Sequence, residues 1–191
     1  MDEVMTIGID LAKRVFEVAL KTADGRIVKQ LGLKRAAFER YMAEEAPRVL
    51  VGLEAGPSAH YWARWLGECG FAVKVMAPRA VQAYRTGPHK SDRLDAPAIA
   101  EAASRQHIRS VGVKSEQAQI RQGLLRVRDR HVGGRTRVLN QLRGLLLEFG
   151  IVAPRNLLTW YPQQTAATPA FAALPDRARA LFDALFEEAG T

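Results

Sequence analysis

The sequence predicts an α/β fold, in which a mixed β-sheet with flanking helices is followed by a long helical segment. Two observations lead to this prediction. The first hundred or so residues alternate short apolar runs, typical of strands, with stretches in which apolar residues have helical spacing. From residue 116 onward the apolar residues repeat only at helical spacing. A chain of 191 residues is long enough to bury one sizeable core and to carry an appendage.

The order of the expected strands indicates the type of sheet. These strands cover residues 4–10, 15–21, 26–33, 48–54 and 71–76. Short connections join the first three, including the turn signal Ala23-Asp24-Gly25, so they should form an antiparallel meander. The later strands are separated by helical stretches, and a strand–helix–strand connection implies a parallel pair with a crossover helix. An antiparallel meander that leads into parallel units is the RNase H-like arrangement.

Two helices are expected between these strands. Residues 35–46 place Phe38, Tyr41 and Met42 at helical spacing. For the second helix, Ser58 should cap the N-terminus, and Gly70 should end it.

A long apolar seam with spacings of three and four follows, close to a coiled-coil pattern. The seam consists of Ile120, Leu124, Val127, His131, Gly134, Val138, Leu142, Leu145 and Phe149. Glycine inside a helix costs about 1 kcal/mol relative to alanine. We therefore expect a hinge, a kink or two separate helices at Gly133 and Gly134.

The C-terminal part is expected to be less regular. Pro154 and Pro162 indicate a linker-like stretch, and residues 175–188 form an amphipathic pattern. Its apolar face consists of Leu181, Phe182, Leu185 and Phe186. The expected segments are a sheet domain (1–110), an Arg-rich helical or coiled-coil segment (111–152), and a linker with a terminal helix (153–191).

The composition is ordinary for a globular protein, with 48% hydrophobic and 25% charged residues. Cys69 is the single cysteine, which excludes an internal disulfide framework and fits a reducing compartment. No apolar run reaches the length of about 18 residues that a membrane span needs. The acidic N-terminus lacks the charge pattern of a signal peptide. We therefore expect a cytoplasmic protein without a membrane partner.

Basic residues concentrate in the helical half of the chain. Residues 105–148 hold ten basic and three acidic side chains, net +7 of the chain's +8. Nine of the ten cations are arginines, which suit bidentate phosphate contacts, so the pattern favours a nucleic-acid partner over a solvated basic face. The candidate nucleic-acid contacts are Lys90, Arg121, Arg126, Arg128, Arg130, Arg135, Arg137 and Arg143. Tyr84 and Arg85 are further candidates, because they precede a pair of acids.

Four carboxylates stand where the sheet would bring them together. Asp10 and Glu54 end strands that should be neighbours, and ligands of open sheets bind beyond the carboxyl ends of strands. Asp92 and Asp95 follow the last strand. Clustered carboxylates repel one another unless cations lie between them, and Mg²⁺ or Mn²⁺ prefers oxygen ligands. We therefore predict Asp10, Glu54, Asp92 and Asp95 as catalytic metal ligands, suited to holding two ions about 4 Å apart for phosphodiester chemistry.

The geometry of the second pair depends on where its helix begins. A start near Ser91 would put Asp92 and Asp95 on one helix face. However, proline is tolerated best in the first turn of a helix, so Pro97 also allows a start at Leu94 or Asp95. In that case Asp95 would be an N-cap and Asp92 would lie in the preceding loop.

Taken in order, these motifs resemble the DEDD-type transposases of bacterial insertion sequences, the group that includes recombinases of the Piv/MooV kind. The motifs are GIDLAK around Asp10, VGLEAG around Glu54, and HKSDRLDA around Asp92 and Asp95. The Arg-rich segment 124–151 resembles a helical segment of the same family. The order of the motifs is specific, whereas GID alone is shared with actin-like sugar kinases.

The resemblance implies a RuvC-like catalytic domain over residues 1–110, with the four acids binding magnesium. It implies that the Arg-rich helices contact DNA, or a structured guide RNA, and help to form a homodimer or higher homo-oligomer. Family members also carry a C-terminal domain with a serine thought to attack DNA. This chain ends at Thr191, before such a domain, so we expect a fragment or a truncated copy.

The predicted function is metal-dependent cleavage and transfer of DNA strands at insertion-sequence ends and target DNA. Two alternatives remain open. One is a non-catalytic module that binds nucleic acid and dimerises. The other is a RuvC-like structure-specific nuclease.

Overall fold

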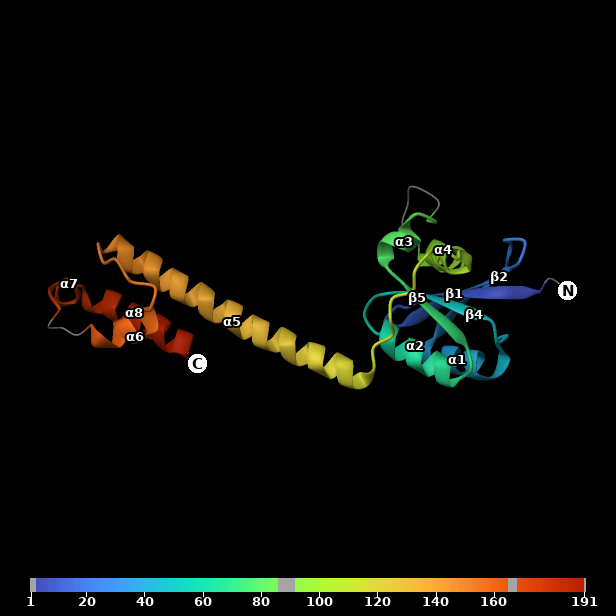
Figure 1. Cartoon of the computed structure of the whole chain (residues 1–191), viewed down its shortest axis with the longest axis horizontal. Coiled ribbons are helices and arrows are strands. Elements are labelled where there is room, and N and C mark those ends of the chain that lie inside the picture. The colour runs from blue at the N-terminus through green and yellow to red at the C-terminus, as the bar shows by residue number, and fades with distance from the viewer. Residues whose placement is uncertain (1–2, 86–91, 165–167, 191) are drawn as a thin grey trace. The chain divides into compact units, whose positions relative to one another are not determined.

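The computed structural model describes residues 3–85, 92–164 and 168–190, without the side chains of residues 92–94. The chain divides into two compact units, Met1–Ser115 and Glu116–Thr191 (Figure 1). The functional division into three segments stays a prediction.

The first unit is built on a five-stranded sheet with the strand order β3-β2-β1-β4-β5. The strands are β1 (Val4–Asp10), β2 (Val15–Thr22), β3 (Ile27–Lys34), β4 (Leu50–Glu54) and β5 (Ala72–Met76). β2 pairs antiparallel with β1 and β3, whereas β4 pairs parallel with β1 and β5. This order and these directions confirm the predicted RNase H-like mixed sheet.

Helices cover both faces of this sheet. They are α1 (Arg35–Arg40), continued by a π-helical turn η1 (Tyr41–Glu45), α2 (Ala59–Glu68), α3 (Pro78–Gln82) and α4 (Asp92–Ser104). α1 and α2 lie on one face, and α3 and α4 lie on the other (Figure 1). On the first face, Phe16 of β2 stacks on Phe38 of α1 with ring centroids 4.6 Å apart, and both meet the edge of Trp62 in α2.

The ends of α2 match the prediction only in part. Gly70 has a φ of 89° and follows the helix, as expected of a glycine at this position. Ser58 precedes the helix, but its side chain makes no capping hydrogen bond, so the predicted cap is wrong. The reason is its left-handed backbone, with a φ of 66°, because capping requires an extended residue there.

α4 lies directly on the sheet at two paired glycines. Gly8 of β1 is opposite Gly52 of β4. A Cβ atom at Gly8 would lie 2.1 Å from the carbonyl oxygen of Ala96 and 2.4 Å from the backbone nitrogen of Ala100. A Cβ atom at Gly52 would lie 2.5 Å from the Cβ atom of Ala103. The helix reaches this depth only because both strand positions lack a side chain.

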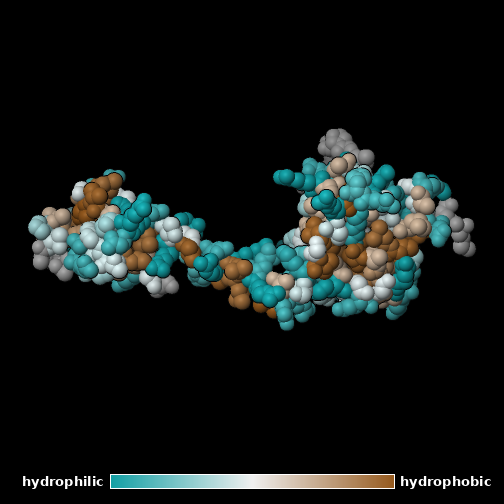
Figure 2. All heavy atoms as spheres, in the orientation of Figure 1, coloured by the Kyte–Doolittle hydropathy of each residue, from teal (hydrophilic) through white to brown (hydrophobic). Residues whose placement is uncertain are grey.

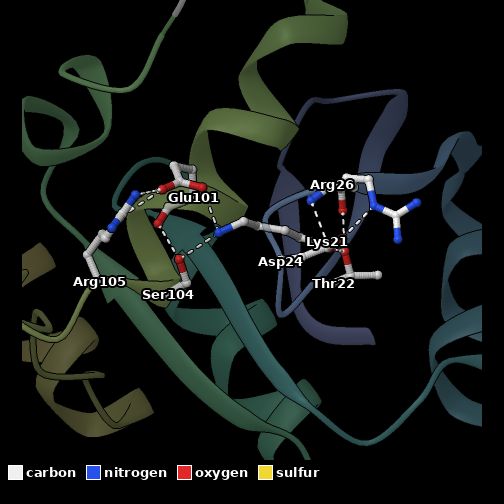
Figure 3. Close-up of polar contacts among 7 residues, drawn as sticks. All are labelled: Lys21, Thr22, Asp24, Arg26, Glu101, Ser104 and Arg105. Atoms are coloured by element: carbon white, nitrogen blue, oxygen red, sulfur yellow. Dashed lines mark hydrogen bonds and ion pairs between the residues drawn. The ribbon is translucent and has the colours of Figure 1, made fainter. Parts of the chain in front are cut away.

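The other end of α4 is held by cations (Figure 3). Lys21 of β2 is buried, and its Nζ lies 2.6 Å from Glu101 Oε2 and donates to Ser104 Oγ at 2.9 Å. Arg105 Nε donates to the second oxygen of Glu101 at 2.7 Å. Lys74 Nζ donates to two carbonyl groups at the end of the helix, 2.7 and 3.1 Å away. Positive charge at a helix C-terminus is stabilising, so these contacts fix α4 against the sheet.

The start of α4 settles one open alternative. The helix begins at Asp92 and continues through Pro97, so a start at Leu94 or Asp95, with Asp95 as N-cap, is wrong. Pro97 has no N–H to donate to the preceding turn, which costs stability. Burial of the alanines that pack α4 onto the sheet offsets this loss of stability.

Where the structure describes the second unit, its regular structure is entirely helical. It contains α5 (Glu116–Glu148), α6 (Leu157–Trp160), a 3₁₀ turn η2 (Tyr161–Gln163), α7 (Pro169–Ala172) and α8 (Asp176–Gly190). α5 runs through Gly133 and Gly134 as one helix of 33 residues, so of the hinge, kink or two helices expected there, the two separate helices are wrong. Propagation adds a hydrogen bond for each residue, and two glycines in so long a helix do not end it.

The core of the second unit includes residues from the stretch expected to be a linker. Leu157 and Tyr161 are buried there with Leu142 of α5 and Phe182 of α8. The Tyr161 hydroxyl also donates to Asp183 Oδ1 at 2.9 Å. The residues after α5 therefore fold back and pack rather than extend. The predicted apolar face of α8 is only partly buried, because Leu181 is 48% exposed.

Gly8→Ala should destabilise the first unit, because the added methyl group would overlap the backbone of α4. Overpacking of this kind costs about 1–3 kcal/mol and occasionally more. Urea unfolding of the full chain, followed by tryptophan fluorescence, measures the change. The matched control is Gly67→Ala in α2, where an added Cβ meets nothing within 4 Å. The control should be neutral or stabilising by up to about 1 kcal/mol, and an equal result for both variants would contradict the close packing at Gly8.

Glu101→Gln should reduce stability at neutral pH and flatten its decrease in acid. The hydrogen bond from Lys21 is the main cause that lowers the pKa of Glu101 below its usual value of 4.5. Its contribution is therefore present above that pH and is lost as the pH falls through the lower folded value. Unfolding free energies measured across this pH range test the sign. Glu68→Gln, at an exposed carboxylate of α2, is the control and should leave the wild-type pH dependence intact.

Candidate active site

Asp10 and Glu54 end two strands that lie side by side. The parallel register pairs Ile9 of β1 with Leu53 of β4, and the next residue on each strand is the acid. Ile9 and Leu53 are buried in the core on the α1 and α2 face. Because side chains alternate along a strand, both acids belong to the opposite face, which carries α4.

α4 brings a third acid to this face. Asp95 comes directly before Ala96, whose carbonyl oxygen lies over Gly8 of β1. The Asp95 side chain is 18% exposed and that of Glu54 is 24% exposed, so both carboxylates are partly withdrawn from water.

One guanidinium lies between these two acids. Arg85 Nη2 donates to Glu54 Oε2 at 2.8 Å, and Arg85 Nε lies 2.8 Å from Asp95 Oδ1. The second contact is an ion pair without the alignment of a hydrogen bond. The buried Nε therefore has no hydrogen-bond partner among the described residues. Glu54 and Asp95, 41 residues apart in the sequence, thus converge on the same cation.

The four predicted metal ligands are brought together only in part. Glu54 and Asp95 share Arg85, and Asp10 ends the strand beside Glu54. Asp92 is the first residue of α4, and its side chain lies outside the described part of the chain. Among the described residues, no three Asp, Glu, His or Cys side chains are close enough to hold a metal ion.

A small cavity opens beside Asp10. Its volume is about 330 Å³, and its lining includes Asp10, Lys13, Arg14 and Glu17. Glu17 of β2 is directly opposite Asp10 in the antiparallel register, so two carboxylates face each other there. The sequence analysis did not single out Glu17. The polar position within VFEVALK would have revealed it only together with the register of the hairpin.

Arg85 makes contacts that the sequence analysis did not predict. It was considered there as a nucleic-acid contact, and in the structure it binds two carboxylates. Its backbone N–H donates to the carbonyl oxygen of Gln82 at 3.2 Å, at the end of the five-residue helix α3. This turn orients the Arg85 side chain toward the acids, and no sequence pattern predicts that orientation.

The predicted nucleic-acid contacts of α5 fall into two groups by exposure. Six of them are exposed: Arg121, Arg126, Arg128, Arg130, Arg135 and Arg137. Arg143 is half-buried and donates to Asn140 Oδ1 at 2.9 Å and to the carbonyl oxygen of Arg155 at 2.8 Å. Arg143 therefore ties α5 to the chain that follows it. Lys90 lies outside the described residues.

The exposed arginines form two stripes along α5. Arg121, Arg128 and Arg135 are seven residues apart and share one helix face, the first stripe. Arg126, Arg130 and Arg137 follow at spacings of four and seven and share another face, the second stripe. Both leave cationic side chains open to solvent.

Part of the predicted seam is also exposed. Apolar surface interrupts the hydrophilic surface along α5 (Figure 2). Three seam residues near the start of α5, Ile120, Leu124 and Val127, are each at least 50% exposed, and so is their neighbour Leu125. Further along, Leu142 of the seam is buried in the core of the second unit, together with Leu146. The seam thus has a packed end and an open end.

No described helix combines the length and the apolar character needed to traverse a lipid bilayer.

Residues 7–151 match the model of the IS110-type DEDD transposase family. The chain belongs to this transposase family. It is 47% identical over 150 residues to the "Probable family 20 transposase" of Pseudomonas aeruginosa, a match covering 78% of this chain and 44% of that protein. It is 35% identical over 163 residues to the "Transposase for insertion sequence element IS1111A" of Coxiella burnetii, covering 85% and 44%. The chain thus spans less than half the length of these curated relatives.

A solved structure also resembles part of this transposase-family chain. It is "T. thermophilus RuvC in complex with Holliday junction substrate", with a TM-score of 0.37 and 17% identity. The match covers 52% of this chain and 92% of that one.

Proposed function

We propose that this chain carries the catalytic domain of an insertion-sequence transposase, which cleaves and transfers DNA strands with the help of divalent metal ions. The observation that carries the proposal is the convergence of Glu54 and Asp95 on one cation, beside the strand that ends at Asp10. Membership of the transposase family supports the same interpretation.

The chemistry of the acids fits magnesium or manganese. Asp10, Glu54, Asp92 and Asp95 would supply carboxylate oxygens, the ligands that these ions prefer. The guanidinium between Glu54 and Asp95 supports the fit, because a cation already lies where two carboxylates meet. When bound, the metal would activate an attacking oxygen and stabilise the leaving oxygen of a phosphodiester. The strand ends and α4 would hold the carboxylates in place.

The arginine stripes of α5 are proposed as the nucleic-acid contacts. Relatives of this chain are named as transposases of insertion sequence elements, so the ends of such an element and its target DNA are the proposed partners. A structured guide RNA is a proposed partner of the same arginines, because RNA and DNA both present phosphate groups that arginine binds. Lys90, close in sequence to Asp92 and Asp95, is proposed to contact the phosphate to be cleaved.

A second copy of the chain is the proposed partner of the open end of the seam. Ile120, Leu124 and Val127 lie at coiled-coil spacing and are exposed. Pairing with the same segment of another copy would bury them, which favours a homodimer.

One observation favours a second function. No three acidic, His or Cys side chains converge among the residues whose side chains the structure describes. This arrangement suits a non-catalytic module that binds nucleic acid and dimerises through α5. Metal binding by the full chain separates this module from the catalytic domain.

Asp10→Asn and Glu54→Gln should each weaken Mn²⁺ binding at least tenfold, because each removes a charged ligand. Loss of even an outer-shell partner of a metal site lowers metal affinity by about 10–100-fold. Calorimetric titration of the full chain with MnCl₂ measures the affinity, and cleavage of a duplex carrying the element's end should fall in parallel. The control Glu68→Gln should bind Mn²⁺ like the wild type. Undiminished binding by both variants would remove these acids from the site, whereas no binding by the wild type would favour the non-catalytic module.

Replacing one arginine stripe of α5 with glutamine should reduce the salt dependence of duplex DNA binding. Removing one phosphate contact makes the slope of log affinity against log salt shallower by about 0.9, so a three-residue stripe accounts for up to about 2.7. Fluorescence anisotropy at several salt concentrations measures this slope. The control variant replaces Lys29, Lys34 and Arg40, three exposed cations of the first unit, with glutamine. Equal slopes for the control and both stripe variants would reject α5 as the binding surface.

A further inference from the structure

Arg85 contacts two acids of the candidate metal site through different nitrogen atoms. Nη2 meets Glu54 and Nε meets Asp95, each at 2.8 Å. These two carboxylate oxygens, Glu54 Oε2 and Asp95 Oδ1, are among the ligands that a divalent ion lying between the acids would use. The guanidinium and a metal ion therefore cannot both occupy the space between the acids.

The charge of this guanidinium is permanent. Arginine stays protonated in proteins, so Arg85 cannot lose its charge to make room for a second cation. Two cations that share the same carboxylates would also repel each other. The conflict is resolved only when the Arg85 side chain moves away.

The surroundings of Arg85 allow such a movement. Its side chain is 29% exposed, so part of the side chain contacts solvent although Nε itself is buried. Its backbone N–H is bonded to the carbonyl oxygen of Gln82 at the end of α3. Rotation about the side-chain torsions is therefore enough, and the backbone stays in place.

We propose that Arg85 is a built-in counter-ion of the acidic site, which holds Glu54 and Asp95 together without metal and leaves them when a divalent ion binds. This inference rests on the proposed metal-dependent function. The competition lowers the apparent metal affinity, because part of the binding free energy is spent on breaking the Arg85 contacts. Arg85 is in this sense a positioning residue, since it keeps two like charges close together before metal arrives.

The test compares Arg85→Gln with the wild type in calorimetric titrations of the full chain with MnCl₂. The variant should bind Mn²⁺ about tenfold more tightly, equivalent to about 1.4 kcal/mol. In thermal unfolding without metal, it should melt at a lower temperature, because the two carboxylates then lose the cation that they share. Mn²⁺ should raise its melting temperature by more than it raises that of the wild type. Arg79→Gln, an exposed arginine of α3, removes the same charge nearby and should change Mn²⁺ affinity by less than about twofold.

The outcomes distinguish failure of the counter-ion role alone from failure of the proposed metal site. Mn²⁺ binding by Arg85→Gln that is unchanged or weaker, with a clear wild-type signal, overturns the counter-ion role and leaves the metal site standing. No Mn²⁺ binding by either protein overturns the proposed metal site and the counter-ion role with it. Should Arg85→Gln not fold, Arg85→Lys carries the test, because one ammonium group cannot present two separated nitrogen atoms. That variant should bind Mn²⁺ about threefold more tightly, and unchanged or weaker binding would again refute the role.

Discussion

The first unit depends on the close approach of α4 to the paired glycines Gly8 and Gly52. Each glycine stands two residues before an acid, in the short patterns Gly-Ile-Asp and Gly-Leu-Glu. Because strand side chains alternate, the glycine and the acid of each strand share one face of the sheet. The positions that admit the helix therefore also place Asp10 and Glu54 beside it, and the helix supplies Asp95 from above.

Placing these acids close together causes electrostatic repulsion, which must be balanced by positive charge. Carboxylates that are brought together and partly withdrawn from water repel unless positive charge lies between them. In the described part of the chain, Glu54 and Asp95 meet this demand through Arg85, while Glu101 meets it at the far end of α4 through Lys21 and Arg105. The same helix thus carries a paired acid near each end, one where function is proposed and one that serves the fold.

The sheet could be predicted because its strands are continuous apolar runs, bounded by turns and acids. Chain connectivity predicted the antiparallel meander, since three consecutive strands precede the first helix, and the RNase H-like arrangement predicted that β1 and β4 are neighbours. Other features depended on contacts that a sequence pattern does not show. Gly133 and Gly134 predicted a break from local propensity, which a helix of 33 residues overrides. The role of Gly52 and the direction of Arg85 needed the register and the turn after α3.

The contacts that fix α4 on the sheet make the strands and α4 the rigid part of the site, whereas the Arg85 side chain is the part that can move. Turning the helix about its axis would drive Ala96 or Ala100 into β1, and sliding it would pull Glu101 away from Lys21. The spacing between the acids is therefore set by the strand positions on which α4 packs. It is not set by α4 itself, which bears Asp95. An engineer who wished to widen or narrow this gap would have to redesign the strands.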